Sequence, residues 1–127
     1  MGERFVYEYA VIRYVPDIER EEFVNVGLVM MCKSRRWVRA QVKVVPERLA
    51  AVGAAHRLSD IERQLLTFTQ TAEGKASAGP VGTFPPEERF RWLTAVKSSC
   101  LQTSRPHPGL TDDPEAEFAR LFSRLVE

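Results

Sequence analysis

The chain has 127 residues, of which 44% are hydrophobic and 28% are charged. A chain of this size buries enough apolar surface to fold as one domain, expected over residues 1–127, without a disulfide or a metal. Its 18 basic and 17 acidic residues leave a net charge of +1, which argues against nucleic-acid binding driven by bulk charge and leaves only a local patch open.

The two cysteines are too few for a disulfide framework or a zinc site. Cys32 and Cys100 both lie in apolar contexts, so we expect buried, reduced thiols. No apolar run approaches the roughly 18 residues needed to cross a membrane, and no signal-peptide pattern opens the chain. These features predict a cytoplasmic protein with no membrane partner.

The first two predicted strands form an apolar centre. Phe5 to Val15 is rich in β-formers at both parities, which predicts a central strand covered on both faces. Pro16 is expected to end its pairing. Strict alternation in the second strand would place Val24, Val26, Leu28, Met30 and Cys32 on one face, with Asn25, Gly27, Val29 and Met31 on the other. Gly27 inside this strand is typical of a bulge or of a close approach to the backbone.

Residues Trp37 to Val45 alternate between apolar and polar side chains, which predicts a strand that closes a β-hairpin with the second one. Helix signals follow it. Pro46 is suited to the first position of a helix, and Ser59 with Glu62 forms a capping-box pattern. Asp113 is expected to cap the last helix.

Together these patterns predict an α+β fold, with a small antiparallel sheet of three to four strands and helices packed mainly on one face. The strands are expected at about 4–15, 23–32, 36–45 and 99–105, and the helices at about 46–53, 59–72, 86–98 and 113–126. The segment Arg105–Gly109, which contains two prolines, is expected to be a rigid surface loop with a capping role.

The opening block carries a resemblance to a known family. The residues are Arg13-Tyr14-Val15-Pro16-Asp17, then Arg20 and Glu22, then Asn25-Val26-Gly27, with Leu101-Gln102-Thr103-Ser104 and Phe118-Ala119-Arg120-Leu121-Phe122 later in the chain. This pattern resembles DUF3037, a bacterial domain family of unknown function, over nearly the whole chain. The resemblance brings no activity, cofactor or catalytic residue. It implies an accessory role, with a HipA-like kinase as a partner.

Metal and nucleophile chemistry find little support in the sequence. The two histidines, His56 and His107, have no second ligand at metal spacing, and Cys100 has no base near it in the sequence. No phosphate-binding or dinucleotide-binding glycine loop is present. We therefore expect no metal, no cofactor and no catalytic residue, and the balance favours a protein that is not an enzyme.

The polar residues of the opening block form a first candidate site, for an anion or another ligand. Its members are Arg13, Asp17, Arg20, Glu22, Asn25 and Gly27. Arg13 starts on a largely apolar strand face, where its guanidinium could point into a pocket beside Asn25 and Gly27. Alternatively, Arg13 reaches water or pairs with Glu22 or Asp17, and Asn25 satisfies backbone groups at a bulge.

A second candidate is a basic face on the third strand and the turn before it. Its members are Lys33, Arg35, Arg36, Trp37, Arg39 and Lys43. Cations for phosphates and one indole for base stacking are what a weak, salt-dependent single-strand binder would use. The alternative is that charges on an edge strand prevent edge-to-edge aggregation.

The function that these observations favour is a non-enzymatic protein-interaction or accessory domain with a protein partner, and a homo-oligomer is a possible form of it. This hypothesis predicts an exposed apolar patch or a self-complementary sheet edge. The alternatives are a weak nucleic-acid-binding module and a small enzyme with an anion pocket near Arg13 and Asn25.

Overall fold

The computed structural model describes residues 3–95 and 100–127. The strands are β1 (Phe5–Asp17), β2 (Glu22–Cys32), β3 (Trp37–Val42), β4 (Leu101–Thr103) and β5 (His107–Thr111). The helices are α1 (Pro46–Ala51), α2 (Leu58–Glu73), α3 (Pro86–Thr94) and α4 (Pro114–Leu125). The predicted α+β class is confirmed.

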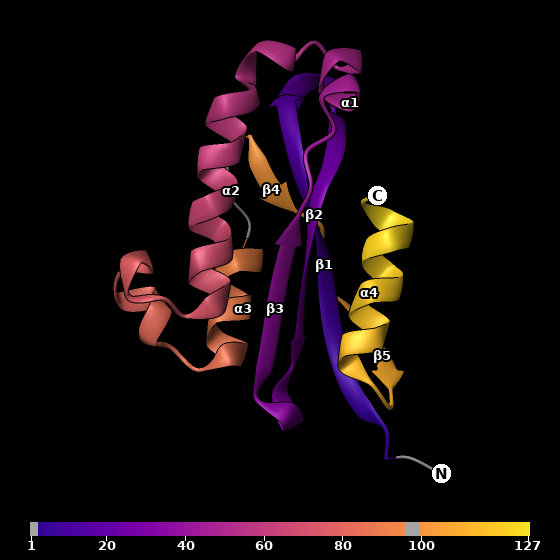
Figure 1. Cartoon of the computed structure of the whole chain (residues 1–127), viewed down its shortest axis with the longest axis vertical. Coiled ribbons are helices and arrows are strands. Elements are labelled where there is room, and N and C mark those ends of the chain that lie inside the picture. The colour runs from indigo at the N-terminus through magenta and orange to yellow at the C-terminus, as the bar shows by residue number, and fades with distance from the viewer. Residues whose placement is uncertain (1–2, 96–99) are drawn as a thin grey trace.

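One curled antiparallel sheet organises the molecule, and β1 lies at its centre (Figure 1). β2 pairs along one edge of β1, and β3 pairs with the far edge of β2. The other edge of β1 is shared by two short strands: β5 pairs with Phe5–Tyr9, and β4 pairs with Ile12–Tyr14. This explains why both parities of β1 are apolar, because a central strand needs cover on both faces.

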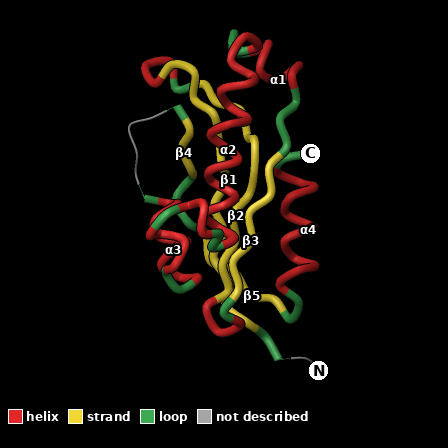
Figure 2. Tube along the Cα trace, turned by 60° about the vertical axis from the view of Figure 1, so that its left-hand side comes forward, coloured by secondary structure: helices red, strands yellow, loops and turns green. Residues whose placement is uncertain are grey.

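Helices cover the two faces of the sheet unequally (Figure 1, Figure 2). The larger buried cluster joins the sheet to α1, α2 and α3 through Leu49, Leu65 and Phe90. On the opposite face, α4 alone packs on the sheet, and its side chains at 3–4 spacing, Phe118, Leu121 and Phe122, are buried there. Of the four helices in the described residues, three therefore lie on one face of the sheet and α4 lies on the other, so the sheet forms a layer between helices.

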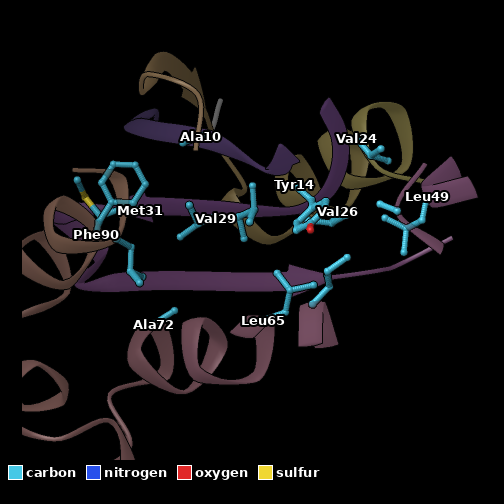
Figure 3. Packing of buried hydrophobic residues seen from close by; sticks show 14 residues of the cluster. Ala10, Tyr14, Val24, Val26, Val29, Met31, Leu49, Leu65, Ala72 and Phe90 are labelled. Carbon is cyan, nitrogen blue, oxygen red and sulfur yellow. The ribbon is translucent and has the colours of Figure 1, made fainter. Parts of the chain in front are cut away.

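A β-bulge in β2 changes which side chains share a face. Ile12 pairs with Gly27 while Arg13 pairs with Asn25, so Val26 is the extra residue. The strict alternation expected for this strand is therefore wrong. Val24, Val26, Val29 and Met31 all belong to the cluster formed with α1, α2 and α3, where Val24 lies near Leu49 and Met31 near Phe90 (Figure 3), whereas Leu28, Met30 and Cys32 face α4.

Of the two alternatives expected at Gly27, the close approach is observed at the residue itself, and the bulge lies at its neighbour Val26. A Cβ at Gly27 would lie 2.8 Å from the carbonyl oxygen of Gln41 and 3.0 Å from side-chain carbons of Ile12 and Val42. The position therefore has no room for a side chain.

The segment Arg105–Gly109 is not the surface loop that its two prolines predict. Residues 107–111 form β5, which continues the edge where β4 ends. Between the two strands, the Ser104 hydroxyl accepts a hydrogen bond from the Val11 amide at 2.9 Å, and the Ser104 amide donates to the Val11 carbonyl at 2.9 Å. The serine thus completes the pairing of β1 where neither short strand reaches.

The helix signals hold in part. Asp113 caps α4 as expected, because its carboxylate accepts from the amide of Ala116. The predicted capping box is wrong: α2 begins at Leu58, so Ser59 lies inside its first turn. Pairing pauses at Pro16, as expected, but resumes between Asp17 and Glu22.

The third helix was expected over 86–98, and the structure ends α3 at Thr94. Phe90 and Leu93 of this helix are buried, whereas Trp92 is 53% exposed. Residues 96–98 of the predicted helix lie outside the described residues.

Candidate functional site

The residues of the first candidate site lie close in sequence but point to three different places. Asp17 accepts a hydrogen bond from the amide of Glu19 and so caps the single turn between β1 and β2. Arg20 and Glu22 form an exposed ion pair at 2.6 Å. These groups are occupied within the turn, and none of them pairs with Arg13.

Asn25 holds the end of the last helix. Its side-chain amide donates to the carbonyl of Leu125 at 3.0 Å, and Arg48 donates to the carbonyl of Val126 next to it. Carbonyls at a helix C-terminus lack partners within the helix, so these side chains supply what α4 cannot. Asn25 therefore satisfies backbone groups, as the alternative interpretation expected, although the backbone belongs to α4 and not to the bulge.

Arg13 lies on the α4 face of β1, beyond the C-terminal end of that helix. Its guanidinium carbon is 4.4 Å from the centroid of the Phe23 ring, which places a cation over an aromatic face. The Nε of Arg13 is shut off from solvent and has no hydrogen-bond partner. A hollow of about 170 Å³ opens there, lined by Arg13, Val15, Ile18, Glu21, Phe23 and Gln102.

The basic residues of the second candidate site lie on the hairpin and partly beneath α4. The half-buried Trp37 ring meets Phe118 edge-on at 6.2 Å, and the Arg39 guanidinium lies 5.3 Å from the same Phe118 ring. Lys43 pairs with Glu127 at 3.8 Å, whereas Lys33, Arg35 and Arg36 are exposed at the turn. A base stacking on Trp37 would have to share that ring with Phe118.

The sequence did not indicate a polar chain between the sheet and α4. The Tyr7 hydroxyl donates to Glu117 at 2.5 Å, and Glu117 accepts two hydrogen bonds from Arg120 at 2.8 Å. Glu117 and Arg120 are three residues apart, a spacing typical of an ion pair on a helix surface, so this contact could have been predicted from the sequence. Tyr7 is 110 residues away from Glu117, and only the fold brings them together.

In this chain of hydrogen bonds, the pKa values of Tyr7 and Glu117 are both shifted. Hydrogen bonds from Arg120, and then from Tyr7, lower the pKa of Glu117 from 4.5 to about 2. Burial, and then the hydrogen bond to Glu117, raise the pKa of Tyr7 from 10.0 to about 12. Across the neutral range the glutamate is thus charged and the tyrosine protonated, which suits a fixed structural link more than a proton carrier.

Gly109 lies opposite Tyr7 and leaves room for its ring. The two residues are directly opposed on β1 and β5, and a Cβ at Gly109 would lie 2.4 Å from the far end of the Tyr7 ring. An aromatic ring over a cross-strand glycine is a recognised way of covering the exposed backbone of an edge strand. His107, placed in the loop by the sequence, instead lies on β5 with its ring 5.2 Å from that of Tyr9.

A wider hollow lies at the start of β1, on the face that carries α3. It measures about 890 Å³ and is lined by Glu3, Arg4, Phe5, Val6, Tyr7, Glu8, Met31, Lys33, Ser34 and Arg91. Val6 is 62% exposed there, and Leu110, directly opposed to it on β5, is 59% exposed. Directly opposed residues of an antiparallel pair share a face, so the two side chains form one apolar surface.

Two further observations concern the described part of the chain. Within residues 3–95 and 100–127, no three His, Cys, Asp or Glu side chains come close enough together to hold a metal ion. Over the same residues, no helix has the length and apolar character required to cross a membrane.

The fold and these contacts define a class of protein: a small α+β protein whose antiparallel sheet lies between one helix and three. The chain belongs to the family described as "Protein of unknown function (DUF3037)", whose sequence profile matches residues 9–126. The resemblance read from the opening block is thereby confirmed. No curated protein and no solved structure matches the chain.

Proposed function

We propose that this chain is a non-enzymatic protein-interaction domain and that its partner docks on the open sheet face at the start of β1. The observation that carries the proposal is the opposed pair Val6 and Leu110, each more than half exposed on a strand face that the neighbouring helices leave uncovered. Exposed apolar groups gathered next to a hollow mark interaction surfaces more often than isolated ones do.

The surroundings of this pair have the make-up of a docking surface. Arg4, Lys33 and Arg91 surround the hollow together with Glu3 and Glu8, so charges of both signs form its rim. An apolar centre within a polar rim is the usual arrangement of a non-obligate protein interface. The mixed charge also favours a folded protein over a nucleic acid, which would meet two carboxylates here.

The resemblance to DUF3037 supplies a first candidate partner, a HipA-like kinase, so this protein would act as an accessory to a catalytic chain. A second copy of the chain is the other occupant to test, because the same apolar pair on two copies could meet face to face.

The test is a binding experiment with matched charge substitutions. A variant carrying Val6→Glu and Leu110→Glu should bind the partner at least tenfold more weakly, because two carboxylates would be desolvated in the interface. Leu66→Glu is the control, since Leu66 is 57% exposed on α2, away from this surface. Sedimentation of the purified chain, with and without the candidate kinase, separates self-association from binding to a different protein.

Two results would overturn the proposal. One is an equal loss of binding in the Leu66→Glu control. The other is a photo-crosslinker placed at Leu110 that captures neither a second copy nor a protein present in stoichiometric amount.

A further inference from the structure

The buried Nε of Arg13, at the other end of β1, marks a second site. The Arg13 guanidinium lies over the Phe23 ring, and this contact gives its Nε–H no hydrogen-bond acceptor. Among the described residues the Nε–H has no acceptor, although it is shut off from solvent. Such a donor is unfavourable when left unpaired, and its usual explanation is a ligand or a water molecule that supplies the missing acceptor.

The nearby carboxylates do not fill this role. Asp17 is engaged by the amide of Glu19, and Glu22 is engaged by Arg20. Glu21 lines the same hollow, but among the described residues no ion pair joins it to Arg13. Within residues 3–95 and 100–127, no hydrogen bond supplies the acceptor that the Arg13 Nε lacks.

The hollow is small, and its lining combines the apolar side chains of Val15, Ile18 and Phe23 with the polar ones of Glu21 and Gln102. Of its lining residues, Val15 is buried, while Ile18 and Phe23 remain 53% and 46% exposed. A volume of about 170 Å³ is below the roughly 300–1,000 Å³ of pockets that hold drug-sized ligands. The hollow suits one small group with an aliphatic side to cover Ile18 and Phe23.

We propose that this hollow binds a monocarboxylate attached to a short aliphatic group, with Arg13 as its anchor. A carboxylate can accept from Nε–H and from a terminal N–H of the same guanidinium, which is the strongest pairing available to arginine. Glu21 at the rim repels multiply charged anions, so phosphate should bind more weakly than a single carboxylate. The site is separate from the surface around Val6 and Leu110, and it does not depend on the function proposed there.

The chemistry has two possible sources, a free aliphatic acid and the C-terminal residue of a peptide. N-acetyl-leucine represents the first, and a pentapeptide ending in leucine represents the second. N-acetyl-leucinamide is the matched probe in which the carboxylate is replaced by an amide.

The experiment follows the Nε–H resonance of Arg13 by NMR in the intact protein during titration with each probe. N-acetyl-leucine should move this resonance and the Phe23 ring signals with one saturable curve. N-acetyl-leucinamide and inorganic phosphate should bind about tenfold more weakly or worse, because each lacks the single carboxylate. Tighter binding by the pentapeptide than by its C-terminally amidated form would assign the site to peptide ends.

Substitutions test whether Arg13 is the residue that binds the acid. Arg13→Gln should abolish binding of N-acetyl-leucine, whereas Arg20→Gln, which removes an exposed arginine of the adjacent turn, should leave it unchanged. If Arg13→Gln does not fold, Glu21→Gln serves instead, and it should tighten binding of the acid and of phosphate.

Three results would overturn the proposal. The Arg13 resonance could stay unmoved at saturating probe, or acid and amide could bind equally. The third is an Nε–H that shows a long-lived water molecule as its acceptor in the free protein and keeps that water during the titration.

Discussion

Glu117 is the residue on which the contact between α4 and the sheet is concentrated. Its carboxylate accepts hydrogen bonds from Tyr7 of the sheet and from Arg120 of its own helix, and its side chain is only 16% exposed. Hydrogen bonds to a charged group that is largely shielded from water contribute more to stability than exposed pairs do. A single substitution here should therefore have a measurable effect.

We expect Glu117→Gln to lower the free energy of unfolding at neutral pH by about 1–3 kcal/mol, because the charged acceptor of two donors is lost. The pKa of Glu117 is lowered on folding, from 4.5 to about 2, so its contribution is present above the unfolded pKa. The difference between the wild type and Glu117→Gln should shrink as the pH falls from about 5 to 2. Urea unfolding across this pH range measures it, and a constant difference would contradict the assignment.

At the scale of elements, the last helix is fastened at both ends by side chains from elsewhere. Near its N-terminal end, Tyr7 of β1 bonds to Glu117. At its C-terminal end, Asn25 of β2 and Arg48 of α1 donate to its last carbonyls. A helix of three turns has marginal stability alone, so these contacts and its buried face determine whether α4 forms.

We expect Asn25→Ala to loosen the last turn of α4 and to cost about 1–2 kcal/mol, because the carbonyl of Leu125 loses its donor. Asn25→Asp should cost more, since a carboxylate would then face that carbonyl. Hydrogen exchange of the amides from 122 to 126 is the measurement, with exposed Arg124→Ala as the control on the same turn. Unchanged protection in Asn25→Ala would show that Arg48 suffices.

At the scale of the whole molecule, the two buried clusters share one sheet. β1 and β2 contribute side chains to both: Ala10 and Val29 face the three helices, while Tyr7 and Leu28 face α4. Neither helix layer can be removed without uncovering strands on which the other layer depends. Loss of packing on one face should therefore weaken the whole molecule.

We expect Phe90→Ala and Phe118→Ala, on opposite faces, each to lower the free energy of unfolding by about 3–5 kcal/mol. Both variants should reduce hydrogen-exchange protection in β1 and β2 by the same amount as this global loss, because the sheet unfolds as a unit. Leu66→Ala, at an exposed position of α2, is the control. Protection that falls only in α4 after Phe118→Ala would show that this helix docks independently.

The candidate sites could be predicted from the sequence only in part. Arg13 was picked out because a charged residue on an apolar strand face is unusual, and the structure places it beside a small hollow. Asn25 and Gly27 were grouped with it because they are near in sequence. The bulge at Val26 and the end of α4 direct them elsewhere. Val6 and Leu110 gave no signal, because exposure depends on where α3 ends and β5 pairs.

The sequence by itself determined the local elements of this protein: the apolar central strand, the hairpin, the helix capped by Asp113 and the close backbone approach at Gly27. Each depends on neighbours within a few residues, where side-chain period, turn chemistry and capping act. Only the tertiary structure decided that α4 covers the opposite face, that Ser104 pairs with Val11 between β4 and β5, and that Tyr7 contacts Glu117. These contacts join residues about 90 to 110 positions apart, so they follow from how the elements bury their apolar faces together.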